Sequence, residues 1–337
     1  MNFKTNAKNF YKNKKVLVTG AGGFIGSHLV EELVKSGASV RSFVRYNSKN
    51  DWGHLEVLPG KIKDSTEVIS GDIQDSFFVR KAVKGVDTVF HLAALIGIPY
   101  SYVAPQHYVR VNVEGTLNVM EACLSEETRR VVHTSTSEIY GTAQYVPIDE
   151  KHPLHPQSPY AASKLGADKI AESYYLSFNL PVVIVRPFNT FGPRQSARAV
   201  IPTIITQLLT MPEIKLGSLD PVRDLTFVKD TVKGFLLAGM VKGISGETIN
   251  VGMGKGYSVK EIVETVFELT GKKKPVVTDK KRIRPEKSEV MRLICGNLKA
   301  QELLEWEPDY TFREGLKEVI KWLEKSISSY KPHLYNV

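Results

Sequence analysis

A glycine-rich turn that directly follows a short apolar segment is the feature that most constrains the fold of this chain. Residues 14–19 read Lys-Lys-Val-Leu-Val-Thr and predict a buried strand, and Gly20 to Gly26 follow without a gap. From Ser27 onward the apolar side chains recur with helical spacing. A strand, a glycine turn and a helix in this order form the context that a dinucleotide-binding fingerprint requires. The sequence therefore predicts that a dinucleotide cofactor binds at this turn.

Each glycine of the turn has a physical task if the turn binds a dinucleotide. Gly20 permits the tight turn, Gly23 lets the backbone approach the pyrophosphate, and Gly26 allows the helix to pack on the strand. The helix N-terminus, at Phe24 and Ile25, would offer N–H donors and the positive end of the helix dipole to the phosphates. An ordinary turn without a ligand is the alternative, and the surrounding strand and helix disfavour it.

Predicted strands and helices alternate strictly as far as residue 186. Apolar segments predict five further strands, at residues 39–44, 68–73, 86–94, 130–133 and 180–186. Amphipathic segments between them predict helices at residues 75–83, 111–123 and 159–175. This alternation predicts an α/β fold, namely a Rossmann-like, doubly wound parallel sheet.

The amino-acid composition changes after Pro187, where Pro, Gly and Arg become frequent. We interpret this part as a smaller C-terminal substrate domain, with helices expected at residues 258–270 and 312–326. The dinucleotide-binding domain would comprise residues 1–186 with about 225–252, and the substrate domain residues 187–224 and 253–337. Residues 1–15 are polar and basic, and we expect them to form a loose arm before the first strand.

Composition and charge disfavour several classes of protein. No apolar run of about 18 residues occurs, and the polar start carries no apolar signal segment, so we expect a cytoplasmic protein that does not enter a membrane. Cys123 and Cys295 match no metal spacing, so we expect free thiols and no metal site. The net charge of +9 fits a solvated basic surface, which is the default, or an anionic small ligand. Since no RNA-binding motif accompanies this charge, no nucleic acid partner is expected.

The ends of the later strands suggest how the rest of the cofactor is bound. An NAD site usually has Asp or Glu after the second strand, whereas this chain has Arg45, which suits a 2′-phosphate and favours NADP over NAD. Asp72, next to Ile73, could accept a hydrogen bond from the adenine amino group. The small residues that end the fourth strand allow close approach of a cofactor: Leu92, Ala93 and Ala94.

A hydroxyl-rich stretch, residues 134–141, follows the fifth strand and reads Thr-Ser-Thr-Ser-Glu-Ile-Tyr-Gly. Ligands bind at the carboxyl ends of strands in open α/β sheets. Hydroxyls around the single carboxylate of Glu138 could bind a sugar there and move a proton.

Tyr160 and Lys164 lie four residues apart on a predicted helix, so they share one face. A nearby ammonium group stabilises a phenolate and lowers the pKa of a tyrosine. This pairing makes Tyr160 a candidate base toward a sugar hydroxyl. The alternative is an exposed aromatic ring beside a solvated lysine, which the nucleotide fold and the hydroxyl-rich strand end make less favoured.

These segments together resemble the extended short-chain dehydrogenase/reductases that act on nucleotide sugars. The resemblance covers residue 15 to about residue 312, and its Gly-x-x-Gly-x-x-Gly spacing is typical of that group. It implies that Asn112 and Thr134 belong to the cofactor site, and that Tyr160 and Lys164 bind the cofactor as well as act in catalysis. It also implies a homodimer.

Four segments narrow the resemblance to 4,6-dehydratases. Residues 135–141 resemble GDP-mannose 4,6-dehydratases and UDP-glucuronate decarboxylases. Residues 95–102, 186–198 and 284–289 look closest to the 4,6-dehydratases of legionaminic-acid biosynthesis. The implied substrate is GDP- or UDP-N-acetylglucosamine. The nucleotide base, the substituent on carbon 2 of the sugar, and NAD against NADP all stay open.

The resemblance implies a role for each residue of the reaction centre. Tyr160 takes the proton of the sugar 4-hydroxyl while carbon 4 gives a hydride to the nicotinamide, and Thr136 binds the 4-oxygen. Glu138 removes the proton of carbon 5, water leaves from carbon 6, and the hydride returns to carbon 6. The dTDP-glucose dehydratases have Asp where this chain has Ser137. Either Glu138 serves as both base and acid, or Ser137 takes part, with a purely orienting role for Ser137 as the alternative.

Three residues are expected to bind the diphosphate and the sugar. Arg223 and Arg284 match positions where the family binds phosphates, and a guanidinium group suits phosphate oxygens. Asn189 matches a position near the sugar and the diphosphate. For Arg194, Arg198 and Arg282 a solvated surface role is at least as well supported.

Two other functions are weighed. A UDP-glucuronate decarboxylase or a 4-epimerase would use the same fold, but decarboxylation needs a cation at the sugar carboxylate, and residues 95–102 offer none. A dinucleotide-binding protein that has lost catalysis and binds nucleic acid or a protein partner is the alternative outside enzymes. The presence of Tyr160, Lys164 and Glu138 together disfavours it.

Overall fold

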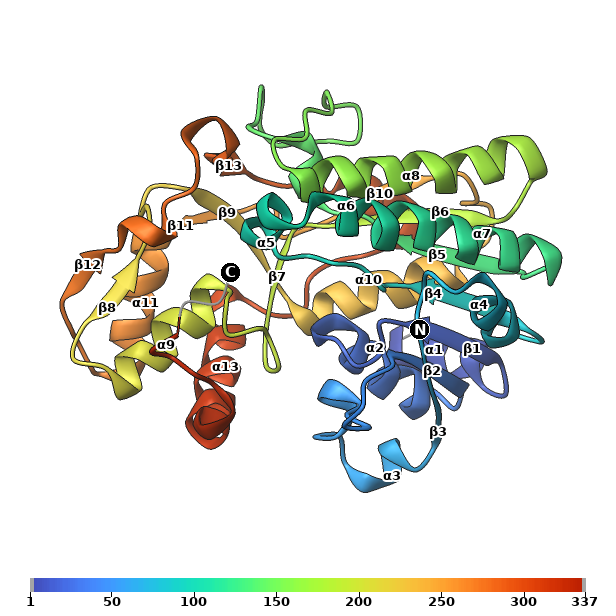
Figure 1. The fold of residues 1–337 in the computed structure, drawn as a ribbon, viewed down its shortest axis with the longest axis horizontal. Helices are drawn as coiled ribbons and strands as arrows, with labels where there is room; N and C mark the ends of the chain where they lie inside the picture. The colour runs from blue at the N-terminus through green and yellow to red at the C-terminus, as the bar shows by residue number, and fades with distance from the viewer. Residues whose placement is uncertain (1–2, 335–337) are drawn as a thin grey trace.

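The structure is a computed structural model that describes residues 3–334, and a parallel sheet of seven strands forms its centre (Figure 1). The strand order is β10-β6-β5-β4-β1-β2-β3. The first strand, β1 (Lys15–Thr19), pairs with β2 (Ser39–Arg45) on one side and with β4 (Thr88–His91) on the other. The chain order therefore reverses at the carboxyl end of β1, which is where open α/β sheets bind ligands. The predicted doubly wound α/β fold is confirmed.

Two layers of helices cover the sheet because alternate residues of each strand face opposite sides. On one side, Val16 and Val18 of β1 pack in a core with α2 (Phe24–Lys35) and α10 (Val228–Met240). On the other side, Leu17 packs with α4, α7 and α8. The remaining bounds in this part are α4 (Ser76–Val83), α7 (Gly115–Ser125), α8 (Pro159–Phe178), β3 (Thr66–Gly71), β5 (Arg130–Thr134), β6 (Val182–Pro187) and β10 (Thr248–Val251).

A smaller group of sheets and helices lies beside the carboxyl edge of the large sheet, on the left in Figure 1. Its central strand, β9 (Val222–Phe227), pairs with β7 (Asn189–Phe191), β11 (Gly256–Ser258) and β13 (Arg292–Leu293). A second small sheet pairs β8 (Ile214–Leu216) with β12 (Val276–Thr278). The helices here are α9 (Val200–Thr210), α11 (Val259–Thr270) and α13 (Phe312–Ser326), whereas α12 (Leu298–Leu304) packs against β10 and α10 of the larger part.

Capping explains where two of these helices begin. Ser258 with Glu261, and Thr311 with Glu314, form capping boxes in which each side chain bonds the other residue's backbone N–H. The sequence pattern predicted both ends of α13 correctly, and it predicted the start of α11 one residue too early.

Short helical segments complete the fold along the connections between strands. They are η1 (Gly53–Leu55), α3 (Gly60–Lys63), α5 (Ile98–Val103), α6 (Pro105–Tyr108), the π-helical η2 (Val109–Glu114), η3 (Ser137–Tyr140), η4 (Lys280–Arg282), η5 (Glu286–Ser288) and η6 (Ile327–Ser329). Among residues 3–334, no helix combines the length and the apolar character that a membrane crossing demands.

Two expectations about local structure were wrong. Residues 3–15 are not a loose arm, because α1 (Phe3–Tyr11) packs on α10, with Tyr11 fully buried and its hydroxyl donating to the Leu236 carbonyl at 2.7 Å. Residues 1–2 of that expected arm lie outside the described residues. The fourth strand is also shorter than predicted, since the backbone N–H groups of Leu92 and Ala93 bond the Thr19 hydroxyl, each at 3.1 Å.

Candidate active site

The glycine turn joins β1 to α2 and has the close contacts that only glycine allows. Gly20 has a φ of +68°, and a Cβ there would lie 2.9 Å from the Ala93 nitrogen. A Cβ on Gly26 would lie 2.2 Å from the Gly20 carbonyl oxygen. Around Gly23, the Gly20 oxygen at 3.1 Å is the one neighbour within 4 Å among the described residues, so space remains on its other side. The turn therefore fits a bound pyrophosphate.

The start of α2 leaves its N–H groups available to that pyrophosphate. The helix begins at Phe24, Ile25 follows, and the preceding Gly23 offers no side chain to cap them. Uncapped N–H groups at a helix N-terminus bind phosphate oxygens well.

The segment after β4 is held tightly against the turn. The Thr19 hydroxyl receives the N–H groups of Leu92 and Ala93, and the same hydroxyl lies 2.8 Å from His91 Nδ1. This arrangement fixes the backbone that leads into Ala94 and the site beyond it. The sequence pattern indicated the small residues but not the threonine that positions them.

Arg45 is exposed and ends β2, and its Cα lies in register with Gly71 of β3. Asp72 follows β3 directly, and its Oδ1 accepts a hydrogen bond from the Gln74 N–H at 3.0 Å, while the next residue, Ile73, is buried. These positions agree with an adenosine site along the ends of β2 and β3.

A loop that sequence reasoning missed crosses the glycine turn. His54 donates its backbone N–H to the Gly22 carbonyl at 2.9 Å, and a Cβ on Gly53 would lie 2.5 Å from that oxygen. Gly53, with a φ of +66°, is the sequence signal that could have marked this contact.

Asn112 supports the site from beneath. It is 1% exposed, and its side-chain amide bonds the Leu95 N–H at 2.8 Å, the Leu95 carbonyl at 3.0 Å and the Ser163 hydroxyl at 2.9 Å. Its amide is therefore engaged in joining the segment after β4 to α8. In this structure Asn112 positions the cofactor site rather than presenting an open surface to it.

The hydroxyl-rich stretch brings the expected catalytic side chains together. Thr136 caps η3, where its hydroxyl accepts the Glu138 N–H at 3.3 Å, and it also hydrogen-bonds the Tyr160 hydroxyl. Glu138 and Tyr160 are 9% and 8% exposed, and the intervening Ser137 is 2% exposed. The structure thus assembles Thr136, Ser137, Glu138 and Tyr160 in one largely buried place.

The expected lowering of the Tyr160 pKa by Lys164 is wrong for this structure. Burial raises the pKa of Tyr160 above its usual range, the Thr136 hydrogen bond lowers it, and the Glu138 carboxylate raises it further. The Lys164 ammonium instead donates to the Thr134 carbonyl at 2.6 Å. Burial also lowers the pKa of Lys164 to about 8, although Asp168 acts to raise it.

Two arginines from the smaller part of the fold converge on Glu289, and one of them also lies near Glu138. Arg223 Nε lies 4.0 Å from Glu138 Oε1, and Arg223 Nη2 lies 3.5 Å from Glu289 Oε1. Arg284 Nη1 lies 3.5 Å from the same Glu289 oxygen. Burial lowers the pKa of Arg223, and the neighbouring charge of Arg284 acts in the same direction. Two guanidinium groups that share one carboxylate retain capacity for an anion such as a diphosphate.

Eight buried side-chain polar atoms lack a hydrogen-bond partner within residues 3–334, and two of them, Asn189 Oδ1 and Thr134 Oγ1, belong to residues expected at the site. Asn189 begins β7, and Thr134 ends β5. Buried polar atoms without a partner are rare in folded proteins, and a ligand hydroxyl would satisfy them. This observation supports both residues as ligand-binding candidates.

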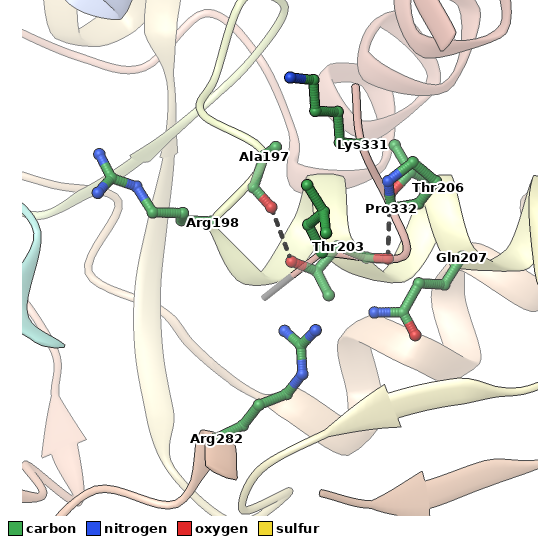
Figure 2. A pocket seen from close by; sticks show the side chains of 9 residues that line it. Ala197, Arg198, Thr203, Thr206, Gln207, Arg282, Lys331 and Pro332 are labelled. Carbon is green, nitrogen blue, oxygen red and sulfur yellow. Dashed lines mark hydrogen bonds between the residues drawn. The ribbon is translucent and has the colours of Figure 1, made fainter. Parts of the chain in front are cut away.

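The three arginines for which a surface role was expected have different surroundings in the structure. Arg194 is 8% exposed and bonds Glu31 of α2 at 2.7 Å, so the surface interpretation is wrong for it. Arg198 and Arg282 line a cavity together with Thr203 and residues of the C-terminal segment such as Lys331 (Figure 2). Sequence reasoning missed that the C-terminal segment reaches this cavity.

Metal ligands are not grouped in this fold. Across residues 3–334, no cluster of three or more His, Cys, Asp or Glu side chains could hold a metal ion. Cys123 and Cys295 are both buried and free.

Comparison with known proteins places this geometry in a family. The family described as GDP-mannose 4,6-dehydratase matches residues 17–319. A dTDP-glucose 4,6-dehydratase of an Actinoplanes species is 33% identical, with 91% of this chain and 97% of the relative covered. An epimerase of Methanothermobacter thermautotrophicus has a similar structure, with a TM-score of 0.89 and 30% identity over 97% of both chains. A dTDP-glucose 4,6-dehydratase of Streptomyces venezuelae, solved with NAD bound, gives a TM-score of 0.82 and 28% identity over 94% of this chain and 99% of that one.

The comparisons include both epimerases and dehydratases, at about 30% identity. The chain belongs to the extended short-chain dehydrogenase/reductases, within the family of NAD-dependent nucleotide-sugar epimerases and dehydratases.

Proposed function

We propose that this protein is a 4,6-dehydratase of a nucleotide-activated hexose, with GDP- or UDP-N-acetylglucosamine as substrate and the 4-keto-6-deoxy sugar as product. The observation that carries the proposal is the carboxylate of Glu138, which lies beside Thr136 and within 4.0 Å of Arg223. An elimination needs a second base, placed at the carbon 5 proton, in addition to the base at the 4-hydroxyl, whereas an epimerisation at carbon 4 needs only the base at the 4-hydroxyl.

The reaction assigns one task to each side chain. Tyr160 takes the proton of the 4-hydroxyl, for which its own hydroxyl must first lose its proton, and Thr136, already hydrogen-bonded to Tyr160, binds the same oxygen. A nicotinamide cofactor bound at the glycine turn would supply the hydride acceptor for carbon 4 and the hydride donor for carbon 6. Glu138 removes the carbon 5 proton, which the 4-ketone makes acidic, and the hydroxyl of carbon 6 leaves as water after it receives a proton from Glu138 itself or through Ser137. Carbon 5 takes up a proton when carbon 6 receives the hydride, which balances the proton that left the 4-hydroxyl.

The same site suggests how the substrate and the cofactor are held. Arg223 and Arg284 would bind the diphosphate, and Asn189 would offer its unpaired Oδ1 to a sugar hydroxyl. Arg45 would bind the 2′-phosphate of NADP, while NAD is the cofactor in the Streptomyces dehydratase structure. We further propose the division into residues 1–186 with about 225–252, and 187–224 with 253–337, and a homodimer formed through the helices of residues 103–123 and 162–178.

Mass spectrometry tests the proposed reaction directly. The purified protein is incubated with GDP- and UDP-N-acetylglucosamine in separate samples, each with NAD and with NADP. We expect a product lighter by the mass of one water, about 18 daltons, in at least one sample. If no nucleotide hexose loses water, the dehydratase proposal is overturned.

A second function, a 4-epimerase or a decarboxylase of UDP-glucuronate, has one observation in its favour. The sequence offered no cation within residues 95–102, but a Cβ on Gly97 would lie 3.2 Å from Arg198 Nη1. A guanidinium group therefore lies next to that segment after all, and it could bind a sugar carboxylate. Release of carbon dioxide from UDP-glucuronate, or a change of configuration at carbon 4 without loss of water, would favour this second function.

A further inference from the structure

The carboxylate of Asp168 lies at the centre of a buried polar network beneath the reaction centre. Asp168 lies one turn after Lys164 on α8 and is 1% exposed. The helix α8 lies over β5 and β6 (Figure 1). Its Oδ2 accepts the Ser135 hydroxyl at 2.6 Å and lies 3.3 Å from two nitrogens of Arg186. Its Oδ1 lies 3.1 Å from His133 Nε2.

The network reaches every segment that carries a proposed catalytic residue. Arg186 of β6 donates to the Tyr140 hydroxyl at 3.0 Å, and Tyr140 belongs to η3, the segment of Glu138. Ser135 is adjacent to Thr134, whose carbonyl accepts the Lys164 ammonium at 2.6 Å. Movement of Asp168 would therefore be transmitted to both ends of the hydroxyl-rich stretch.

Charge gives Asp168 a second task. Lys164 is 4% exposed, and burial alone lowers its pKa, so a buried ammonium there needs a negative partner to stay charged. The other titratable groups that face it are His91 of β4 and His133 of β5, and burial lowers the pKa of each, so both rings are neutral near pH 7. Asp168 raises the pKa of Lys164, and burial, which acts to raise the pKa of Asp168, is outweighed by His133, Arg186 and Lys164.

A buried carboxylate with this many charged partners is expensive to desolvate, and a packed apolar group would give similar stability. The presence of a buried carboxylate at this place is explained if its charge has a function. We propose that Asp168 is a positioning residue, which holds the end of β5 through Ser135 and supplies the negative charge that keeps Lys164 protonated and placed for the cofactor. This inference rests on the proposed function, because it concerns the same reaction centre.

The pH dependence of cofactor binding tests the charge role without any nucleotide sugar. NADH affinity is measured by fluorescence titration between pH 6 and pH 10, for the wild type and for Asp168→Asn. We expect the wild-type affinity to fall as pH rises through about 8, because Lys164 loses its proton. In Asp168→Asn we expect the midpoint about one pH unit lower, since an opposite charge nearby shifts a pKa by about that much or more.

Two comparison variants make this result specific to Asp168. Glu172→Gln removes another carboxylate of α8, an exposed one paired with Lys169, and should leave the midpoint unchanged. Asp168→Glu keeps the charge and should restore most of the shift. A folded Asp168→Asn protein with the wild-type midpoint, or an Asp168→Glu protein as impaired as Asp168→Asn, would overturn the proposal.

A second variant covers the case in which Asp168→Asn does not fold. Ser135→Ala removes the 2.6 Å hydrogen bond but leaves every charge in the network paired. We expect NADH affinity to fall about threefold to tenfold, as for the loss of one hydrogen bond to a charged group, with the pH midpoint unchanged. Unchanged affinity in Ser135→Ala would contradict the positioning role. Because these assays need no sugar substrate, absence of dehydration would count against the proposed function alone.

Discussion

Arg223 Nε lies 4.0 Å from Glu138 Oε1, although β9 carries the arginine and η3 carries the glutamate. Arg284 contacts Glu289 instead, at 3.5 Å. The residue proposed to remove the carbon 5 proton is therefore coupled to one of the two residues proposed to bind the diphosphate. The two arginines should differ when each is removed.

Substitution of the two arginines should separate binding from catalysis. In Arg284→Ala we expect the KM for the nucleotide sugar to rise about tenfold with kcat nearly unchanged, because only binding of the diphosphate is lost. In Arg223→Ala we expect kcat to fall about tenfold as well, because Glu138 loses its neighbouring charge. Steady-state kinetics of water loss measures both constants. Equal effects of the two variants on kcat would contradict the coupling of Arg223 to Glu138.

Glu138→Gln should stop dehydration without stopping oxidation. The amide cannot take the carbon 5 proton, so we expect the rate of water loss to fall by roughly 10² to 10⁴. Tyr160 and Thr136 are left in place, so reduction of the bound cofactor by the sugar should persist as absorbance near 340 nm. Ser137→Ala is the matched comparison: a similar loss there would give Ser137 the role of acid, and a near-normal rate would leave that role to Glu138. Full activity in Glu138→Gln would exclude Glu138 as the base.

Asp224 should make the folded state more stable in mild acid. Burial raises its pKa to about 6 despite hydrogen bonds from the N–H groups of Met253, Cys295 and Gly254. Because this is above the ordinary value of 3.8, the stabilisation from protonation is complete below that value and is lost as pH rises through about 6. The difference over that window is about 3 kcal/mol.

Thermal unfolding of the wild type and of Asp224→Asn between pH 4 and pH 8 measures this contribution. The wild type should lose more stability than the variant as pH rises from 4 to 7, whatever the absolute stability of the variant. Parallel curves for the two proteins would show that Asp224 does not titrate in this range.

Local patterns predicted the sheet and its glycine turn because those features depend on neighbours in sequence. Gly20 and Gly26 contact backbone within the same turn or the adjacent strand, and strand alternation fixes the rest. The hydrogen-bond partner of Lys164 could not be predicted. Helix spacing predicts that Lys164 and Tyr160 share one face, but it does not show that the Thr134 carbonyl is the acceptor of the ammonium group. Arg194 and Arg198 were also beyond prediction from sequence, because their partners lie in α2 and near Gly97, far away along the chain.

The packing of α1 through Tyr11 also could not be predicted from the sequence. It offers a simple test of stability. Tyr11→Phe keeps the packed ring and removes the hydroxyl that donates to the Leu236 carbonyl. We expect a loss of about 1 kcal/mol in the free energy of unfolding, because one buried carbonyl loses its donor. Phe10→Leu, at a half-buried position of α1, is a comparison that leaves this hydrogen bond intact. No change in urea unfolding for Tyr11→Phe would show that α1 does not dock as described.

Substitution of Arg45 tests the proposed preference for NADP over NAD. Its side chain is exposed at the end of β2, beside the proposed adenosine site, so its charge is available to a 2′-phosphate. Arg45→Asp should weaken NADPH binding at least tenfold, because attraction is replaced by repulsion, while NADH binding is kept or improved. Arg41→Gln changes a charge on the same strand that is already paired with Glu67 at 2.8 Å, so the preference should not move. Fluorescence titration of both cofactors with the three proteins gives the ratio of affinities, and a ratio that Arg45→Asp leaves unchanged would remove Arg45 from the cofactor site.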